Sequence, residues 1–288
     1  MGDEGARVPA WVERRLAGRE PGRGVAKVLR ALAADPRRMS YASTAAAARA
    51  AQVNVATVVR AAQLLGFSGW PALRAEIRSR YLAGLSASQV LTEHATDDGP
   101  ARATLRRELA NLRDLSAVLD EEQIGRAARL LVDARVTLVL GSGSFAAPGL
   151  QLAHLAQTLG HDVRLQQVGG TGLLNAVSLL REGDCVVAML LWRTPREVLD
   201  ALGVARERGA RVVVVSDRAG EPFSHLATEL VQVPSEGAGM FPSVVAATTV
   251  VQAVVAAVVA LDPAAARRAS DGIQALWDRY GLFPDPDA

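Results

Sequence analysis

Residues 51–73 read AQVNVATVVRAAQLLGFSGWPAL, and this stretch determines the expected organisation of the N-terminal part of the chain. A polar break centred on Val53 separates an alanine-rich helical run at 43–51 from a second helical run at 55–65. Asn54 is a good N-cap for the second helix because its side chain can accept a hydrogen bond from a free backbone N–H. Two helices joined by a short turn are typical of the helix-turn-helix, whose second helix enters the major groove of DNA. A plain helical bundle fits the same spacing.

The helix expected at 55–65 has two faces of different character. Helical spacing directs one face to a core and leaves Thr57, Arg60, Ala61 and Gln63 more exposed. An arginine can hold a phosphate or a guanine edge, and a threonine can contact a base or a phosphate. The N-terminus of a helix also attracts phosphate. We therefore expect the DNA contacts at Asn54, Val55, Thr57, Arg60 and Gln63.

The charge of the chain is unevenly distributed along the sequence. Residues 1–95 carry 14 Lys and Arg against 7 Asp and Glu, a net charge of +7, whereas residues 96–288 carry 18 against 23, a net charge of −5. This asymmetry favours a basic module that meets a polyanion, joined to a module that does not.

After two helical stretches at 105–119 and 121–132, the chain alternates short apolar runs with helical stretches, which predicts a parallel sheet covered by helices on both faces. The apolar runs expected to form strands are 136–140, 163–165, 185–191, 212–215 and 230–233. A polar stretch that ends at Pro100 marks the expected domain boundary. We expect a flexible arm at 1–22, a helix-turn-helix domain at 23–85, a linker at 86–104 and an α/β domain at 105–288.

The stretch quoted first resembles the N-terminal module of RpiR-family transcriptional regulators. That family has a Ser-x-x-Thr-Val-x-Arg recognition helix followed by Leu-Gly-Phe-x-Gly-aromatic-x-x-Leu. Here Asn54 stands where the family usually has Ser, and both residue types cap helices. The matching positions are Thr57, Val58, Arg60, Leu65, Gly66, Phe67, Gly69 and Trp70. We expect Trp70 to be a core residue.

Residues 105–288 resemble the sugar isomerase (SIS) domain that RpiR-family regulators carry. The resemblance implies an α/β fold with an N-terminal all-α helix-turn-helix domain followed by a doubly wound α/β/α domain. The sheet of that second domain would have five parallel strands in the order 2-1-3-4-5. A ligand is expected where the strand order reverses, at the carboxyl ends of strands 1 and 3.

Two loops would meet at that position. The loop at 141–145 offers backbone N–H groups and serine hydroxyls to an anion. The loop at 191–197 departs from the Ser-x-Ser-Gly-x-Thr pattern of domains that bind sugar phosphates, and this departure puts a phosphosugar ligand in doubt. Its arginines suit a carboxylate as well as a phosphate, and its tryptophan offers a flat apolar face. The expected ligand-binding residues are Ser142, Gly143, Ser144, Trp192, Arg193, Thr194 and Arg196.

Several classes of protein are disfavoured by the sequence. The only cysteine, Cys185, lies in an apolar run and is expected to be a buried hydrophobe, so that no disulfide framework is possible. No spacing of His, Asp or Glu predicts a metal site, and no cofactor is expected. The apolar run at 244–261 is expected to be a core or interface helix, not a membrane span. Glu236 is expected to lie on the surface. The polar N-terminal residues predict a cytoplasmic protein with no membrane partner.

Together these features predict a ligand-responsive regulator of transcription that is not an enzyme. Its expected partners are a double-stranded DNA operator, a small anionic metabolite and further copies of itself in a homodimer or homotetramer, because operators repeat their half-sites. Two alternatives stay open. One is an aldose–ketose isomerase acting on a phosphosugar, and the other is a DNA-binding protein whose α/β domain serves only assembly.

Overall fold

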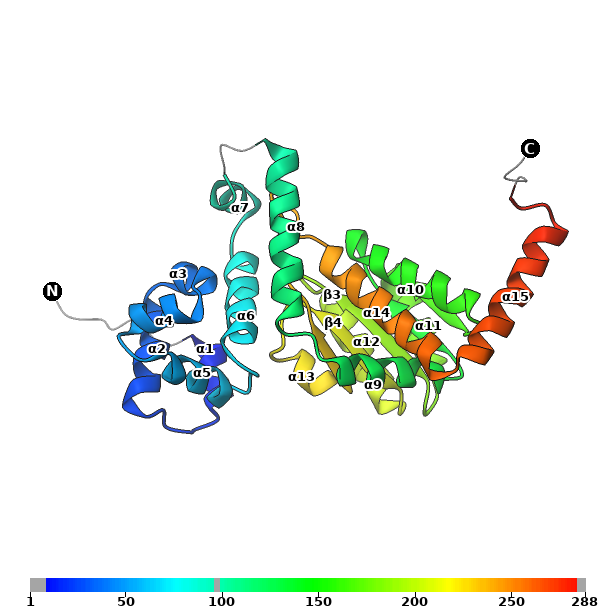
Figure 1. Cartoon of the computed structure of the whole chain (residues 1–288). Coiled ribbons are helices and arrows are strands. Elements are labelled where there is room, and N and C mark those ends of the chain that lie inside the picture. Colours follow the sequence, from blue (N-terminus) through cyan, green and yellow to red (C-terminus); the bar gives the residue numbers. More distant parts are fainter. Residues whose placement is uncertain (1–8, 96–98, 284–288) are drawn as a thin grey trace. The chain divides into compact units, whose positions relative to one another are not determined.

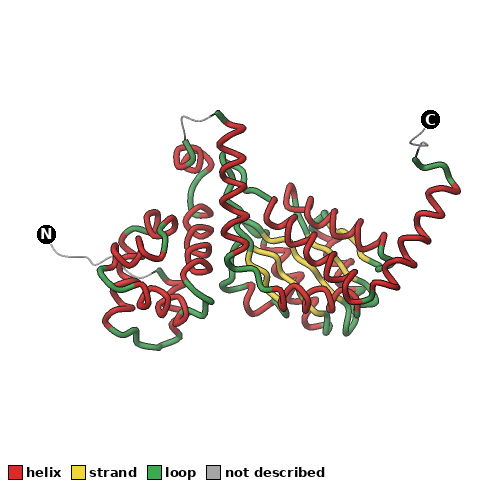
Figure 2. The backbone as a smooth tube through the Cα atoms, viewed as in Figure 1, coloured by secondary structure: helices red, strands yellow, loops and turns green. Residues whose placement is uncertain are grey.

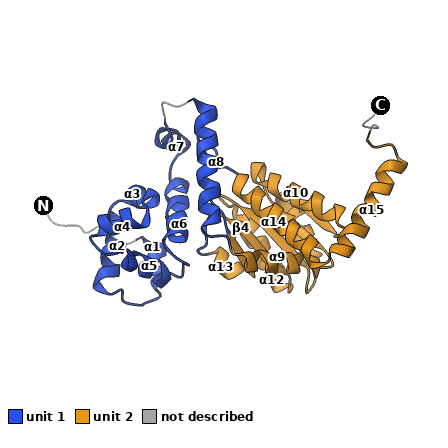
Figure 3. Ribbon diagram, in the orientation of Figure 1, with its two compact units in different colours: residues 1–119, 217–221, 232–243 blue, residues 120–216, 222–231, 244–288 orange. Residues whose placement is uncertain are grey.

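The computed structural model describes residues 9–95 and 99–283, and these fold into two compact units (Figures 1 and 3). Unit 1 comprises residues 1–119 together with the two later segments 217–221 and 232–243. Unit 2 comprises the rest of the chain from residue 120. Residues 1–8 of the expected arm lie outside the described part.

Unit 1 is built from helices, which are drawn in blue to green in Figure 1. The bounds of these helices are α1 Ala10–Leu16, α2 Arg23–Ala34, α3 Pro36–Tyr41, α4 Thr44–Ala51, α5 Val55–Leu64, α6 Trp70–Ala83, α7 Ala87–Glu93 and α8 Pro100–Ser116. The caps explain several of these limits: the side chains of Ser43 and Asn54 accept hydrogen bonds from the backbones of α4 and α5. Gly66, with φ of +81°, ends α5 in the left-handed conformation that glycine adopts most easily.

The core of unit 1 forms beneath α4 and α5. Ala47, Ala48 and Ala51 of α4 are buried, and their small side chains permit α2 and α5 to approach closely. Trp70 at the start of α6 is 1% exposed, and its Nε1 donates a hydrogen bond to the carbonyl of Ala42 at 2.8 Å. The expectation that Trp70 is a core residue is therefore confirmed.

Three parts of unit 1 differ from the expected organisation. Within the expected flexible arm, α1 packs into the core, because Val12 is fully buried. Residues 36–41, for which the sequence predicts no helix, form α3, and the side chain of Asp35 caps it. The expected linker at 86–104 contains α7, which starts with a capping box formed by Ser86 and Gln89.

Unit 2 contains a five-stranded sheet in the order β2-β1-β3-β4-β5, which confirms the order expected from the resemblance. The strands are β1 Thr137–Leu140, β2 Val163–Gln166, β3 Cys185–Leu190, β4 Arg211–Ser216 and β5 Glu229–Gln232. The register pairs Leu138 with Arg164 on β2 and with Val186 on β3, in parallel. Strands β1 and β3 are buried along their whole length, as expected for a parallel sheet with both faces covered.

Helices cover both faces of this sheet, as Figure 2 shows in red around the yellow strands. One layer contains α9 Glu121–Val132, α10 Ala146–Thr158 and α14 Val245–Leu261. The other contains α11 Gly170–Ser178, α12 Arg196–Glu207 and α13 Phe223–Leu226. The last helix, α15 Pro263–Arg279, buries only Ala266. This is the doubly wound α/β/α architecture that the sequence predicts.

The apolar run at 244–261 forms α14, whose Ala246, Val250 and Val254 are buried. In the described part of the chain no single helix is long and apolar enough to span a membrane, and α14 meets that test only as a pair with α15, bent by 107°. Cys185 is fully buried in β3, and burial raises the pKa of its thiol to about 12. The expectation of an inert buried cysteine is confirmed.

Candidate DNA interface and effector loops

Helix α5, which the sequence predicts to be the recognition helix, presents a polar edge to solvent. Asn54, Arg60 and Gln63 are exposed, and the side chain of Val55 in the first turn is 48% exposed. The opposite side of α5 packs into the core through Val58 and other apolar residues. The first turn and the outer face of α5 are therefore free to meet a groove of DNA, as a recognition helix must.

A short chain of hydrogen bonds orders this edge. Asn54 Oδ1 accepts from the backbone N–H of Thr57 at 2.9 Å and from the Thr57 hydroxyl at 2.8 Å. The Thr57 hydroxyl in turn accepts from Nη2 of Arg60 at 2.9 Å. The N-cap thus fixes both the start of the helix and the resting position of the guanidinium that is expected to contact DNA.

The expected exposure of Thr57 and Ala61 is wrong. Thr57 is only 6% exposed and Ala61 is fully buried. The reason lies in α2, where Gly24 has no side chain: a Cβ added at Gly24 would lie 2.9 Å from Cγ2 of Thr57. The methyl group of Thr57 therefore packs against α2, and only its hydroxyl is available, which Arg60 and Asn54 already use.

In unit 2, the loop that follows β1 is a tight turn. A Cβ added at Gly141 would lie 2.8 Å from Cα of Ala146, so that only glycine fits at this point. Gly143 has φ of +56° and begins a single turn of 3-10 helix, Gly143–Phe145, which leads into α10. Ser144 is exposed and Ser142 is half-buried.

The loops after β1 and β3 enclose a cavity of only about 10 Å³, about the volume that one water molecule needs. Ser142, Arg193 and Thr194 line this cavity. The other expected ligand residues are not among the described residues that line the cavity: Gly143, Ser144, Trp192 and Arg196. The structure thus brings together three of the seven expected ligand residues and leaves no room there for a sugar phosphate.

Side chains of the protein itself occupy the surroundings of this cavity. The guanidinium of Arg193 lies 4.8 Å from the ring centre of Trp192, whose backbone has φ of +61°. Oε2 of Glu197 accepts a hydrogen bond from the N–H of Gly170 at 2.9 Å and so occupies the start of α11. The side chain of Arg196 is 93% exposed beside Asp200, so that Arg196 points to solvent.

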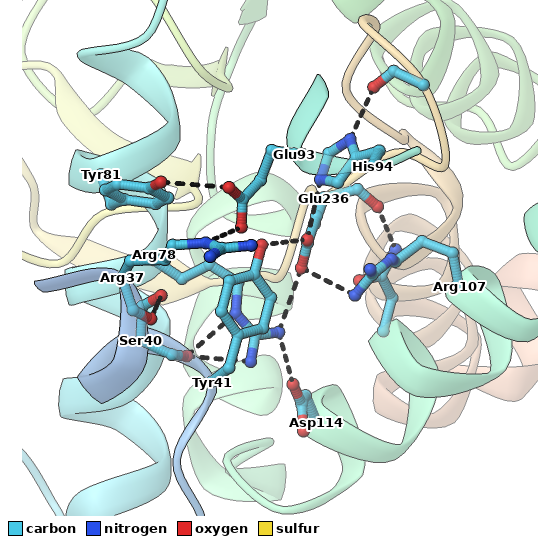
Figure 4. Close-up of polar contacts among 12 residues, drawn as sticks. Arg37, Ser40, Tyr41, Arg78, Tyr81, Glu93, His94, Arg107, Asp114 and Glu236 are labelled. Carbon is cyan, nitrogen blue, oxygen red and sulfur yellow. Dashed lines mark hydrogen bonds and ion pairs between the residues drawn. The ribbon is translucent and has the colours of Figure 1, made fainter. Parts of the chain in front are cut away.

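A second polar site lies within unit 1, around Glu236. Its side chain is only 2% exposed, so the expectation of a surface glutamate is wrong. Figure 4 shows the side chains that converge on this carboxylate from α3, α6, α8 and the end of α7. The contacts are Tyr41 Oη to Oε1 at 2.7 Å, His94 Nε2 to Oε1 at 2.9 Å, Arg107 Nη1 to Oε2 at 2.9 Å and Arg78 Nη1 to Oε2 at 3.2 Å. We call these five residues the Glu236 cluster.

Burial and charge oppose one another in the Glu236 cluster. Burial alone would raise the pKa of Glu236, but the hydrogen bond from His94 and the charges of Arg78 and Arg107 outweigh it, and the pKa is lowered. The hydrogen bond to Glu236 raises the pKa of His94. Burial, followed by the nearby carboxylate, raises the pKa of Tyr41. The carboxylate is therefore ionised and fully engaged.

No sequence pattern marks this cluster, because its members lie far apart in the chain and follow no motif. Tyr41 and Glu236 are separated by 195 positions. In the described residues, no group of three or more His, Cys, Asp or Glu side chains is placed to hold a metal ion.

Comparison with known proteins identifies both parts of the chain. Residues 24–83 match the model of the helix-turn-helix domain of the rpiR family, and residues 130–260 match that of the SIS domain. The chain is 30% identical over 217 residues to the HTH-type transcriptional regulator HexR of Pseudomonas aeruginosa, over 72% of this chain and 73% of HexR. It is 27% identical over 193 residues to the regulator RpiR of Escherichia coli K12, over 65% of this chain and 64% of RpiR.

Two solved structures share the fold. The sugar isomerase domain of an RpiR transcription factor from Sphaerobacter thermophilus aligns with a TM-score of 0.56 and 25% identity, over 59% of this chain and 96% of that one. The NanR protein of Vibrio vulnificus complexed with ManNAc-6P aligns with a TM-score of 0.57 and 20% identity, over 96% of this chain and 100% of that one.

Proposed function

This chain belongs to the RpiR family of helix-turn-helix transcriptional regulators, and we propose that it reads its operator through α5 of unit 1. The observation that carries this proposal is the exposed edge of α5. There Asn54, Val55, Arg60 and Gln63 face solvent on a helix whose other side is fixed in the core. Such an edge suits the major groove, where arginine and glutamine side chains can donate hydrogen bonds to base edges. We assign Thr57 a supporting role, because its buried hydroxyl positions Arg60.

Sequence-specific binding to operator DNA is the measurement that tests this proposal. A DNA fragment from upstream of the protein's own gene is titrated at several salt concentrations, with an unrelated fragment of equal length as competitor. We expect a specific complex that forms at least about 10³-fold more tightly than the complex with unrelated DNA. Equal affinity for both fragments across the salt series would contradict operator recognition.

The proposed effector is a small anionic metabolite, either a sugar phosphate or another phosphate or carboxylate compound. The SIS fold and the arginine and serine at the loops after β1 and β3 support this class. The cavity there holds only about 10 Å³, so we infer that the loop at 191–195 must open before a ligand of this size can enter.

Thermal-shift measurements with ManNAc-6P, inorganic phosphate and citrate test this class of ligand. Stabilisation that saturates with a phosphate ester, and is lost in Arg193→Ala, is expected. Stabilisation by none of the three, with operator binding intact, would instead favour a SIS domain that serves only assembly. The small size of the cavity is the observation that keeps this second function open.

We further propose a regulator that is not an isomerase and that acts in the cytoplasm, where its DNA would be. Glu236, which could otherwise serve as a general base, is already bound by two arginines, a tyrosine and a histidine. Homodimers or homotetramers would present two recognition helices to repeated half-sites. The outer face of α14 and the exposed Leu105 and Leu109 of α8 are the proposed assembly surfaces.

A further inference from the structure

The segment 232–243 leaves β5 and continues into α14, and within unit 1 it is fastened to the helices at several points. The segment folds back on itself, with Ser243 N–H donating to the carbonyl of Ser235 at 2.8 Å. The Ser243 hydroxyl donates to Glu108 of α8 at 2.7 Å, and Asn111 of α8 donates to the carbonyl of Glu236 at 2.8 Å. The Glu236 side chain then reaches α3 and α6, which belong to the DNA-binding module.

His94, directly after α7, contacts this segment with both of its ring nitrogens. Nε2 lies 2.9 Å from Oε1 of Glu236, and Nδ1 lies 2.9 Å from the carbonyl oxygen of Gly239. Both partners can only accept hydrogen bonds, since Glu236 is ionised. A neutral imidazole carries one N–H and can satisfy only one of them, whereas an imidazolium donates to both. The geometry therefore requires a protonated His94.

We propose that the proton on His94 fastens segment 232–243 to the DNA-binding helices, so that the attachment of this segment loosens when His94 loses its proton. His94 and Glu236 act as positioning residues in this arrangement. The consequence for DNA binding rests on the proposed function, whereas the attachment itself does not.

The side chain of His94 is only 4% exposed, and the pocket that it lines is the route by which a proton can enter and leave. His94 lines an open pocket of about 320 Å³ together with Glu93, Arg106 and Arg107. Of the charged groups that face it, Arg107 disfavours the imidazolium, and Glu236 favours it. The neighbouring Glu93 is engaged elsewhere, with Arg37 at 2.8 Å and with the hydroxyl of Tyr81 at 3.2 Å.

Arg78 connects Glu236 to two further charged groups, Asp114 and Arg74. Arg78 of α6 pairs with the carboxylate and also with Asp114 of α8, at 3.3 Å. Asp114 in turn pairs with Arg74 of α6 at 2.5 Å. The charges of Arg78 and Arg107 favour the ionised form of Glu236, and His94 is the member of the cluster whose ordinary pKa lies near neutral pH.

The direction of the pH effect follows from the raised pKa of His94. Its ordinary value is 6.5, and in the folded protein the pKa lies above it. The stabilising contribution is therefore fully present below about pH 6.5 and is lost as the pH rises through the folded value. Each unit by which the pKa of His94 in the folded protein exceeds its ordinary value changes the opening equilibrium of segment 232–243 by about tenfold.

Hydrogen–deuterium exchange of the full chain, read by mass spectrometry from about pH 6 to about pH 9 and corrected for intrinsic exchange rates, tests the attachment. In the wild type, protection of the amides in 236–243 is expected to fall as the pH rises. In His94→Gln the protection is expected to be lower at pH 6 and independent of pH. The matched control His154→Gln, at an exposed position of α10, should behave as the wild type.

Protection that is independent of pH in the wild type, or that keeps its pH dependence in His94→Gln, would overturn the proposal. Glu236→Gln provides a second route, because it should also lower the protection of 236–243 at pH 6. Titration of upstream DNA with the same proteins then tests the consequence, and the difference in affinity between pH 6 and pH 9 should shrink in His94→Gln. If the wild type binds no DNA specifically, the proposed function fails while the exchange result still decides the attachment.

Discussion

The recognition helix α5 and the loops after β1 and β3 are the two regions expected to bind other molecules, and they differ in how much of their surface is available. In α5 the polar edge is exposed, and Asn54 and Thr57 position Arg60 without covering it. In the loops, Arg193 stacks on Trp192 and Glu197 occupies the start of α11. The exposed edge of α5 can bind DNA in the conformation described. The loops after β1 and β3 have to open before a ligand can reach their polar groups, so this conformation says less about the ligand.

The largest expected effect concerns stability and compares Trp70 in the core of unit 1 with Trp192 in the loop after β3. Trp70 is 1% exposed and donates a hydrogen bond to Ala42, so Trp70→Ala should lower the free energy of unfolding of unit 1 by about 3–5 kcal/mol. Trp192→Ala should cost less than about 1 kcal/mol, because the Trp192 side chain is partly exposed. Urea denaturation followed by circular dichroism measures both, and equal losses would mean that Trp192 is packed as tightly as Trp70.

Loss of Arg193 should change the ligand affinity of the loops after β1 and β3 and not the stability of the protein. A guanidinium bound to a phosphate contributes about 1.5–3 kcal/mol, so Arg193→Ala should weaken phosphate-ester binding by roughly tenfold to hundredfold. Arg196→Ala is the matched control, since that side chain is 93% exposed. Isothermal titration calorimetry gives both affinities, and a larger loss for Arg196→Ala would contradict the assignment of Arg193 as the main phosphate ligand.

The smallest expected effect concerns the cap of α5. Asn54→Ala removes the acceptor for the backbone and the hydroxyl of Thr57, which should cost about 1 kcal/mol of stability. Asn54→Ser, the residue type usual in the family, should retain most of it. Thermal unfolding followed by circular dichroism distinguishes them, and an alanine variant as stable as the wild type would mean that the hydrogen bonds of Asn54 do not order this edge.

Local patterns in the sequence predict most of the fold. Alternating apolar runs locate the five strands, because strand and helix periodicities are local properties of the sequence. The order of the strands in the sheet comes from the resemblance. The short helices α3 and α7 fall where polar composition favours a turn or a linker. They form because Asp35 and Ser86 cap them.

The sites are harder to predict than the fold because their properties depend on distant contacts. Thr57 has an outward-facing pattern in the sequence, and only its contact with Gly24 of α2 buries it. The Glu236 cluster joins residues from five separate segments of the chain. Residue type alone predicts a surface position for Glu236, because glutamate is rarely buried. The small cavity between the loops after β1 and β3 is likewise lined by residues from both loops, among them Ser142 and Arg193, and no local pattern encodes their packing.

The central claim, that α5 reads base edges in the major groove, is tested most directly by methylation interference on the upstream DNA. Guanine N7 faces the major groove, so methylation at the contacted guanines should prevent binding by the wild type. In Arg60→Ala, which should bind about 1–3 kcal/mol more weakly, the interference at those guanines should disappear. Interference at the same guanines in both proteins, with equal affinities, would contradict the assignment of Arg60 and of the α5 edge as the surface that reads DNA.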